Sequence, residues 1–200
     1  MSGLMQTLVN DYFVIAIEQG ACLMVSQTFE KLKAEKKDRL KRVLIDEFSN
    51  YTLDQAQVAR IVKKAGISRG SFYTYFSNLY DAYHWTLSEI LQNVHHVQNT
   101  DPLEGTIAFI ENLPHNPYYD FLDKYFQINE TLLRTHAPEL SPRQAIPTLA
   151  PTATDQTVRN WLAMISTHSL IQERFAFPDH ADDILQSLRQ LSVWIHDQEA

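Results

Sequence analysis

Apolar residues recur along this chain at intervals of three and four positions, which is the spacing of a helix with one buried face. Residues 31–50 show the pattern clearly, because charged residues separate the members of one stripe, which are Leu32, Leu40, Val43, Leu44 and Phe48. The 200 residues include five glycines, and no long run alternates apolar and polar positions between turn signals. The pattern therefore predicts an all-α fold.

Two short helices are expected after residue 50. Asp54 followed three positions later by Gln57 is typical of a capping box, so we expect a helix to open there. Its buried face would carry Val58, Ile61 and Val62. Gly66 would end this helix, because glycine readily adopts the positive φ of a sharp turn. Ser68 would cap a third helix through Phe76, and the three helices would form one compact unit.

Capping residues and prolines mark the later helices. A fourth helix is expected from Ser77 or Asn78 to about residue 96. Asp101 and Asn116 each precede a proline, which predicts helices reaching about residues 113 and 135. Prolines make residues 136–154 mostly loop, with one short helix inside, before a long helix at 155–176. Residues 177–179 would break that helix and cap the last one.

Positive charge is concentrated in one segment of an acidic chain. Between residues 31 and 80 there are eleven lysines and arginines against five acids, although the whole chain carries a net charge of −7. A basic segment on an acidic body would orient the molecule on a polyanion. The alternative is a solvated, charged helix face, and charge alone does not decide between the two.

The first part of the chain indicates a cytoplasmic protein with no membrane partner. The apolar stretch at residues 8–25 is interrupted by polar and charged side chains, and no basic segment typical of a secretory signal precedes it. Cys22 is the single cysteine, which excludes a disulfide within the chain and fits a reducing compartment. No His-x-x-x-His pattern or cysteine cluster occurs, so we expect neither a metal site nor a cofactor.

Residues 57–76 carry the pattern that is most informative about function. Their sequence, QVARIVKKAGISRGSFYTYF, resembles the DNA-binding signature of the TetR/AcrR regulators, in which an Ile-Ala-x-x-Ala-Gly-Val-Ser turn leads into Gly-Thr-Leu-Tyr-x-Tyr-Phe. The resemblance covers about fifty residues, 31–83. It implies an N-terminal helix-turn-helix domain at residues 31–77 and a helical domain at 78–200 that binds an effector and dimerises.

The third helix is expected to enter the major groove of DNA. Arg69 is the candidate for reading a base, because a guanidinium binds both acceptors of guanine. Ser71 and Thr74 could contact a thymine methyl or a phosphate, and Tyr73 and Tyr75 could bind phosphate or pack against the first helix. The expected DNA-binding residues are Gln57, Lys63, Ser68, Arg69, Ser71, Tyr73, Thr74 and Tyr75.

Basic residues near this motif have two interpretations. Lys63 and Lys64 would attract phosphate or merely increase solubility, and Arg60 is a further candidate for contact with the DNA backbone. Leu79 stands where the family usually has a lysine that contacts phosphate. One anchoring contact is therefore missing or is supplied elsewhere, which would weaken operator affinity.

The resemblance also implies that the C-terminal half binds a small molecule and pairs with a second copy. The expected effector pocket is Phe109, Tyr118, Phe121, Tyr125, Trp161 and His168, although aromatic residues at helical spacing also form ordinary core. The expected dimer interface is Leu162, Ile165, Ile184, Leu188, Leu191 and Ile195. Spacing does not say whether this stripe faces a core or a partner. A helix-turn-helix that reads two half-sites independently favours a homodimer.

Residues 1–30 form an extension before the first helix of the motif. One hypothesis is that Met24 is the native start, since Gln19-Gly20-Ala21 can be encoded by a purine-rich ribosome-binding sequence. The alternative is an additional helix at residues 4–19, which would pack Leu8, Tyr12 and Ile15 on a neighbour.

Two other classes of function are alternatives. A helical hydrolase that uses His168 or a histidine–carboxylate pair lacks support, because no Gly-x-Ser-x-Gly, metal-binding or phosphate-loop pattern occurs. A helical interaction protein that has lost DNA binding is the other alternative, for which Leu79 is the hint. The sequence favours a TetR-type regulator, a repressor that a small-molecule effector releases from operator DNA.

Overall fold

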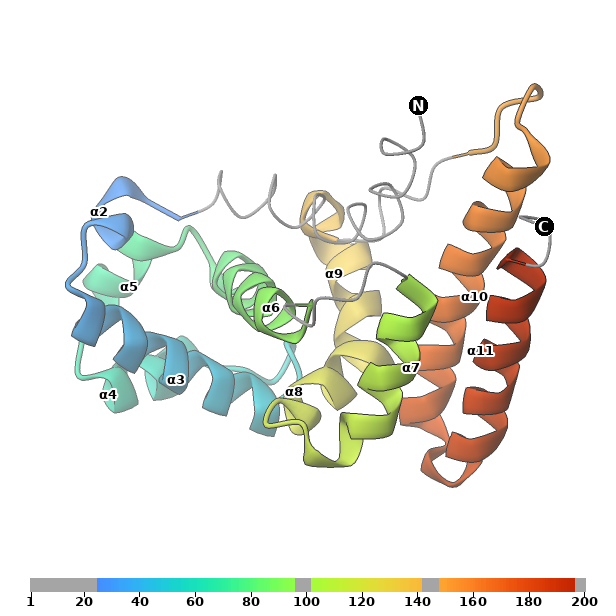
Figure 1. Ribbon diagram of the computed structural model, residues 1–200. Helices are drawn as coiled ribbons and strands as arrows, with labels where there is room; N and C mark the ends of the chain where they lie inside the picture. Colours follow the sequence, from blue (N-terminus) through green and yellow to red (C-terminus); the bar gives the residue numbers. More distant parts are fainter. Residues whose placement is uncertain (1–24, 96–101, 142–147, 197–200) are drawn as a thin grey trace.

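The computed structural model describes residues 25–95, 102–141 and 148–196, and within these ranges the regular structure is helical, without strands (Figure 1). The predicted all-α fold is confirmed. The hypotheses about Met24 as the native start and about a helix at residues 4–19 concern positions outside the described residues. Cys22 lies outside them as well.

The N-terminal unit consists of α2 (Gln27–Glu30), α3 (Ala34–Asn50), α4 (Val58–Ala65) and α5 (Arg69–Tyr75). Helix α3 begins three residues later than expected, because residues 31 and 32 still close the last turn of α2 through backbone hydrogen bonds. Phe29 of α2 is fully buried, with its ring centroid 5.1 Å from Phe76 and 4.9 Å from Trp85. Residues just before the expected domain boundary at 31 therefore belong to this core.

The capping box predicted at Asp54 and Gln57 is wrong. Thr52 Oγ1 donates to Asp54 Oδ1 at 2.5 Å, and the amides of residues 55 and 56 donate to the Thr52 carbonyl, so this segment is a turn. Helix α4 begins only at Val58. The Gln57 N–H donates at 2.8 Å to Glu47 Oε1, which belongs to α3. The start of α4 is thus stabilised by a distant carboxylate, which a local pattern could not reveal.

The turn between α4 and α5 forms as expected. Gly66 adopts φ +63°, the left-handed conformation that favours glycine. Ser68 caps α5 by accepting a hydrogen bond from the Ser71 N–H at 3.0 Å. Phe72 is fully buried, and its ring centroid lies 5.5 Å from that of Phe76. One ring therefore holds α5 against the core while the opposite face of this short helix stays outside.

The remaining helices are α6 (Leu79–His95), α7 (Pro102–Asn112), α8 (Tyr119–Lys124), α9 (Glu130–His136), α10 (Asp155–Ala176) and α11 (Ala181–His196). The bounds of α10 match the expected helix, and Thr154 caps it. Helices α8 and α9 follow one another through a π-helical turn at Tyr125–Asn129, where a single uninterrupted helix was expected. In this turn the Glu130 N–H donates to the Tyr125 carbonyl, five residues earlier.

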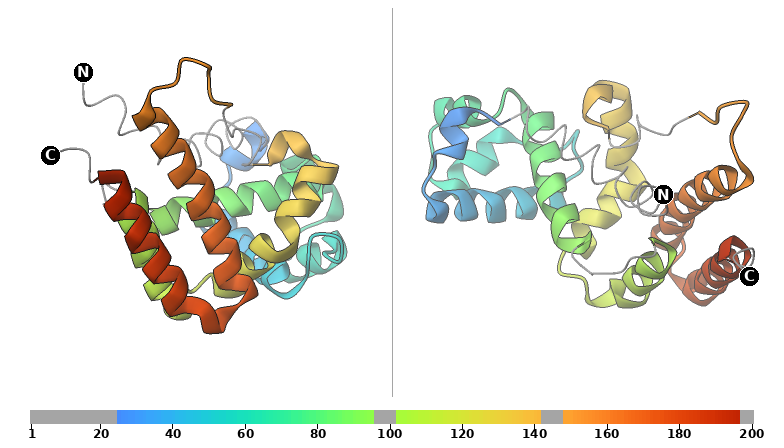
Figure 2. Two further views of the ribbon diagram at one scale, coloured as in Figure 1. Left: turned by 90° about the vertical axis from the view of Figure 1, so that its right-hand side faces the viewer. Right: turned by 45° about the horizontal axis from the view of Figure 1, so that its top comes forward.

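Helices α4 and α5 lie at one end of the molecule, and α10 and α11 lie at the other (Figure 1). A view from the side shows α10 and α11 running beside one another (Figure 2). Between the two ends, α3 packs on α8 and α6. Phe48, Tyr83 and Phe121, which belong to these three helices, are fully buried in one hydrophobic cluster. The N-terminal and C-terminal halves therefore share a continuous core across the expected boundary at residue 78.

Candidate DNA-binding interface

Helix α5 presents a polar face to solvent. Arg69, Tyr73 and Thr74 are exposed, and Tyr73 retains 46% of its accessible surface. Arg69 Nη2 lies 3.5 Å from the Tyr73 hydroxyl, and the guanidinium carbon lies 5.7 Å from the Tyr73 ring centroid. The guanidinium and the phenol thus stand next to each other on one surface, where both can donate hydrogen bonds to a ligand.

Three other residues that were expected to contact DNA help to hold α5 in place. Ser68 and Ser71 are joined by a hydrogen bond of 2.8 Å between their hydroxyls, and Ser68 also caps the helix. Tyr75 is half-buried, with its ring centroid 5.8 Å from that of Phe29, and its carbonyl accepts from the Ser26 N–H. Tyr75 therefore packs within the protein, as its second interpretation expected, but the helix that its ring contacts is α2 and the expectation named the helix at 31–50.

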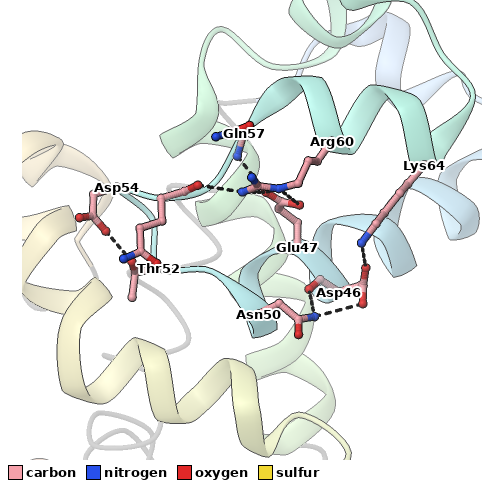
Figure 3. A network of polar contacts seen from close by, with 9 residues as sticks. Asp46, Glu47, Asn50, Thr52, Asp54, Gln57, Arg60 and Lys64 are labelled. Carbon is pink, nitrogen blue, oxygen red and sulfur yellow. Dashed lines mark hydrogen bonds and ion pairs between the residues drawn. The ribbon is translucent and has the colours of Figure 1, made fainter.

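A network of polar contacts joins α4 to α3 (Figure 3). The Glu47 carboxylate is fully buried and receives Arg60 Nη2 at 2.7 Å as well as the Gln57 N–H. Arg60 also donates to the Gln55 carbonyl, and its guanidinium lies 3.7 Å from the ring centroid of Tyr51. The hydrogen bond with Glu47 raises the pKa of Arg60. Arg60 is therefore engaged in fixing α4 on α3.

The two lysines of α4 differ in their surroundings. Lys64 Nζ lies 2.5 Å from Asp46 Oδ2, and this hydrogen bond raises the pKa of Lys64. Lys63 is exposed on the same last turn of α4. Gln57 is exposed directly before the helix. Leu79 is half-buried and packs against the hydrophobic core. Its apolar side chain supplies no charge at the start of α6, where the family's lysine would.

Four of the expected effector-pocket residues belong to one hydrophobic cluster or pack against it, namely Phe109, Tyr118, Phe121 and Tyr125. Phe121 and Tyr125 are fully buried, and the Phe121 ring stacks on that of Tyr83 at 5.3 Å. Phe109, Tyr118 and Trp161 are half-buried. For Phe121 and Tyr125, the alternative of ordinary core therefore describes their surroundings.

His168 belongs to a polar cluster that the sequence pattern did not predict. His168 Nε2 lies 3.0 Å from Glu130 Oε1, and Gln172 Nε2 donates to Glu130 Oε2 at 2.7 Å. Glu130 is 2% exposed, and it follows Asn129, which is completely buried. Acidic and amide residues in a helix pattern are ordinarily expected at the surface. A signal that could have revealed them is their position between the apolar residues Phe126 and Leu133, at helical spacing from both.

The expected dimer stripe of α11 faces the inside of the chain. Ile184, Leu188 and Ile195 are buried in a second hydrophobic cluster with Leu103 and Ile107 of α7, so within this chain they form core, the alternative that the spacing left open. Leu191 is half-buried beside them. The physical reason is that α7 covers this face, and the spacing of a stripe carries no information about what covers it.

The outward face of the last two helices is partly apolar. Val193 is 63% exposed, Trp194 is 44% exposed, and Leu162 of α10 is 38% exposed. Arg159 Nη1 donates to the Trp194 carbonyl at 2.8 Å, and its guanidinium carbon lies 4.4 Å from the Trp194 ring. Ile165, one turn beyond Leu162, is half-buried. These residues offer an apolar patch with a cation beside it.

Two kinds of feature are absent from the part of the chain that the structure describes. Among these residues, no group of three or more histidine, cysteine or acidic side chains could hold a metal ion. No helix built from them has the length and apolar character needed to cross a membrane.

Comparisons with known proteins point to one family. The sequence profile of the tetR family of bacterial regulatory proteins matches residues 45–79, which span the end of α3, all of α4 and α5, and the first residue of α6. No curated protein sequence matches the chain significantly.

Two solved structures resemble the fold. A TetR transcriptional regulator from Rhodococcus sp. RHA1 has a TM-score of 0.50 at 14% identity, over 83% of this chain and 99% of the other. A TetR family transcriptional regulator from Chloroflexus aurantiacus J-10-FL has a TM-score of 0.43 at 22% identity, over 86% of this chain and 95% of the other. At 14% identity, the similarity to the Rhodococcus protein concerns the fold alone.

Proposed function

We propose that this chain is a member of the tetR family of bacterial regulatory proteins and that it binds double-stranded operator DNA with α5 in the major groove. The observation that carries the proposal is the seating of α5, in which Phe72 is fully buried while Arg69, Tyr73 and Thr74 face solvent. A helix held on one side and polar on the other matches the way in which a helix-turn-helix reads base edges.

The expected DNA contacts take distinct roles in this proposal. Arg69 reads a guanine, since its guanidinium is exposed near the start of α5. Lys63 in α4 and Gln57 directly before that helix contact the DNA backbone. Tyr73 and Thr74 add hydroxyls on the exposed face of α5. Residues 31–77 would serve as the DNA-binding domain, while Ser68, Ser71 and Tyr75 mainly hold α5 in position.

The proposal includes a homodimer formed through the outward face of α10 and α11. Leu162, Val193 and Trp194 would become buried between two copies, which removes their apolar surface from water. A twofold pair presents two α5 helices to two half-sites about one DNA turn apart. Because the stripe first assigned to the interface is buried by α7, the partner would meet the opposite side of α11.

We further propose that the protein is a cytoplasmic repressor, that residues 78–200 bind a small-molecule effector, and that this effector releases it from its operator. Aromatic and polar groups on and next to α10 favour an effector site there. They are the half-buried Trp161 and the cluster of His168, Glu130 and Gln172. The proposed activity is regulation of transcription, with no part in catalysis.

Sequencing of the DNA fragments retained by the purified protein tests the function. We expect a short, twofold-symmetric sequence to be enriched, and the binding of that duplex to weaken steeply as salt concentration rises. The rival, a helical interaction protein that has lost DNA binding, would enrich no sequence and would show no salt-dependent shift of a duplex. Such a result would refute the proposed function.

A further inference from the structure

Asn129 uses both ends of its side chain to join three separate parts of the chain. Its Oδ1 accepts a hydrogen bond from the Leu53 N–H at 2.8 Å, and its Nδ2 donates to the Tyr83 hydroxyl at 3.2 Å. Asn129 and Tyr83 are completely buried, and Leu53 is 3% exposed. Leu53 lies in the turn between α3 and α4, so a residue of the C-terminal half holds the chain that leads into the helix-turn-helix.

Burial makes this contact energetically important. A buried backbone N–H that loses its acceptor costs more than an ordinary exposed hydrogen bond would contribute. Burial also raises the pKa of Tyr83 far above the ordinary value for tyrosine, so its hydroxyl stays protonated. The turn at residues 52–57 ends at Gln57, whose N–H is held by Glu47. Asn129 and Glu47 thus fix the two ends of the segment that positions α4.

Glu130, the next residue, points to a different neighbour. Its carboxylate receives His168 and Gln172, both of which lie on α10. The π-helical turn at Tyr125–Asn129 immediately precedes it. A π-helical turn holds more residues than an α-helical one, and a one-residue shift in a helix rotates all later side chains by about 100°. Converting this turn to a regular helix would therefore withdraw both side chains from their partners.

We propose that Asn129 is a positioning residue for α4 and α5, and that Glu130 makes this position depend on the state of α10. The π-helical turn is the element that can change, between its present form and a regular α-helical turn. The hydrogen bonds of Asn129 on one side and of Glu130 on the other favour the present form. Displacing His168 or Gln172 from Glu130 weakens the hold of Asn129 on Leu53. The inference rests on the proposed function only where it predicts an effect on DNA binding.

Hydrogen exchange of the Leu53 amide measures the contact directly. Asn129→Ala is expected to raise the Leu53 exchange rate about tenfold relative to Leu44, which is buried in α3. Glu130→Gln is expected to raise it about threefold, because the charge that holds α10 is removed. The matched controls are Asn112→Ala and Glu139→Gln, since both residues are exposed and should leave Leu53 unchanged.

A double variant separates coupling from general loosening. If Glu130 acts through Asn129, Glu130→Gln should change Leu53 exchange no further once Asn129→Ala is present. Gln172→Leu, at a half-buried position on α10, provides a milder variant with the same expected direction as Glu130→Gln. The proposal would be overturned if the Leu53 amide exchanged no faster in Glu130→Gln and Gln172→Leu than in the control Glu139→Gln. An equal rise at Leu53 and Leu44 would also overturn it.

DNA affinity is the second measurement, made on a synthetic duplex carrying the enriched sequence. Asn129→Ala is expected to weaken binding about tenfold without changing the salt dependence, because no phosphate contact is lost. Exchange and affinity report separately on the two proposals. A chain that binds no duplex but shows the Leu53 effects refutes the proposed function and supports the coupling. A chain that binds the duplex but shows no change in Leu53 exchange supports the proposed function and refutes the coupling.

Discussion

The Arg39 guanidinium occupies the space that a side chain on Gly66 would need, since a Cβ at residue 66 would lie 2.1 Å from Arg39 Nη2. Gly66 also has φ +63°, which a side chain disfavours. We expect Gly66→Ala to lower the free energy of unfolding by about 1–2 kcal/mol in chemical denaturation. The matched control is Gly70→Ala inside α5, where the new Cβ would meet Ser68 Oγ at 3.7 Å. That substitution should stabilise the fold slightly, and similar losses at both glycines would contradict the argument.

Arg69 and Lys63 should affect DNA binding in different ways. Arg69→Ala is expected to cost about 1–3 kcal/mol on the cognate duplex and to relax preference at one base pair, because a base contact is lost. Lys63→Ala should weaken all duplexes alike and reduce the salt slope by about 1. Titrations of cognate and scrambled duplexes at several salt concentrations measure both effects. Equal losses for Arg69→Ala on the two duplexes would rule out its assigned role.

Two neighbouring carboxylates of α3 should differ greatly in their effect on stability. Glu47 is fully buried and accepts from both Arg60 and the Gln57 N–H, so Glu47→Gln should cost about 1–3 kcal/mol. Asp46 is half-exposed and pairs with Lys64 at the surface, so Asp46→Asn should leave the denaturation midpoint nearly unchanged. The two variants change charge equally, which makes each the control for the other. Matching midpoints would show that the buried network contributes little.

Local sequence patterns predicted the helix-turn-helix well, because the groups that decide it are neighbours in sequence. Gly66 and Ser68 each act within a few residues, through a positive φ and a side-chain cap. Spacing also placed α10, whose cap is the residue just before it. Where the deciding partner is distant, prediction failed: Glu47, ten residues away, supports the start of α4 in place of Asp54.

The C-terminal half illustrates the same limit at longer range. The stripe of Ile184, Leu188 and Ile195 has the same spacing whether α7 or a second copy covers it. Asn129 and Glu130 bind partners 76 and 38 residues away, and nothing nearby in the sequence indicates those partners. A polar residue becomes a buried contact only through the fold, so the candidate coupling site required the structure.

The two sides of α11 should separate folding from assembly. Leu188 is completely buried, so Leu188→Ala should cost about 2–5 kcal/mol of folding stability. Trp194→Glu, on the exposed side, should leave folding nearly unchanged and shift the protein towards monomers, because a charge would be buried between two copies. Sedimentation velocity measures the assembly, and Gln190→Glu adds the same charge at an exposed position as a milder comparison. A Trp194→Glu variant that assembles like the parent chain would place the partner elsewhere.

His84 should make stability depend on pH. It is 2% exposed, and burial lowers its pKa below the ordinary value, an effect that Asp81 partly opposes. The folded state therefore takes up the proton less readily than the unfolded state, so stability is retained above about pH 6.5 and falls as the pH decreases below it. Between pH 7.5 and 5.5 the parent should lose up to about 1.4 kcal/mol more than His84→Gln, measured by urea denaturation. The comparison isolates His84 from the other seven histidines of the chain, which are unchanged in the variant. Equal losses in the two proteins would mean that His84 takes up its proton as easily when folded as when unfolded.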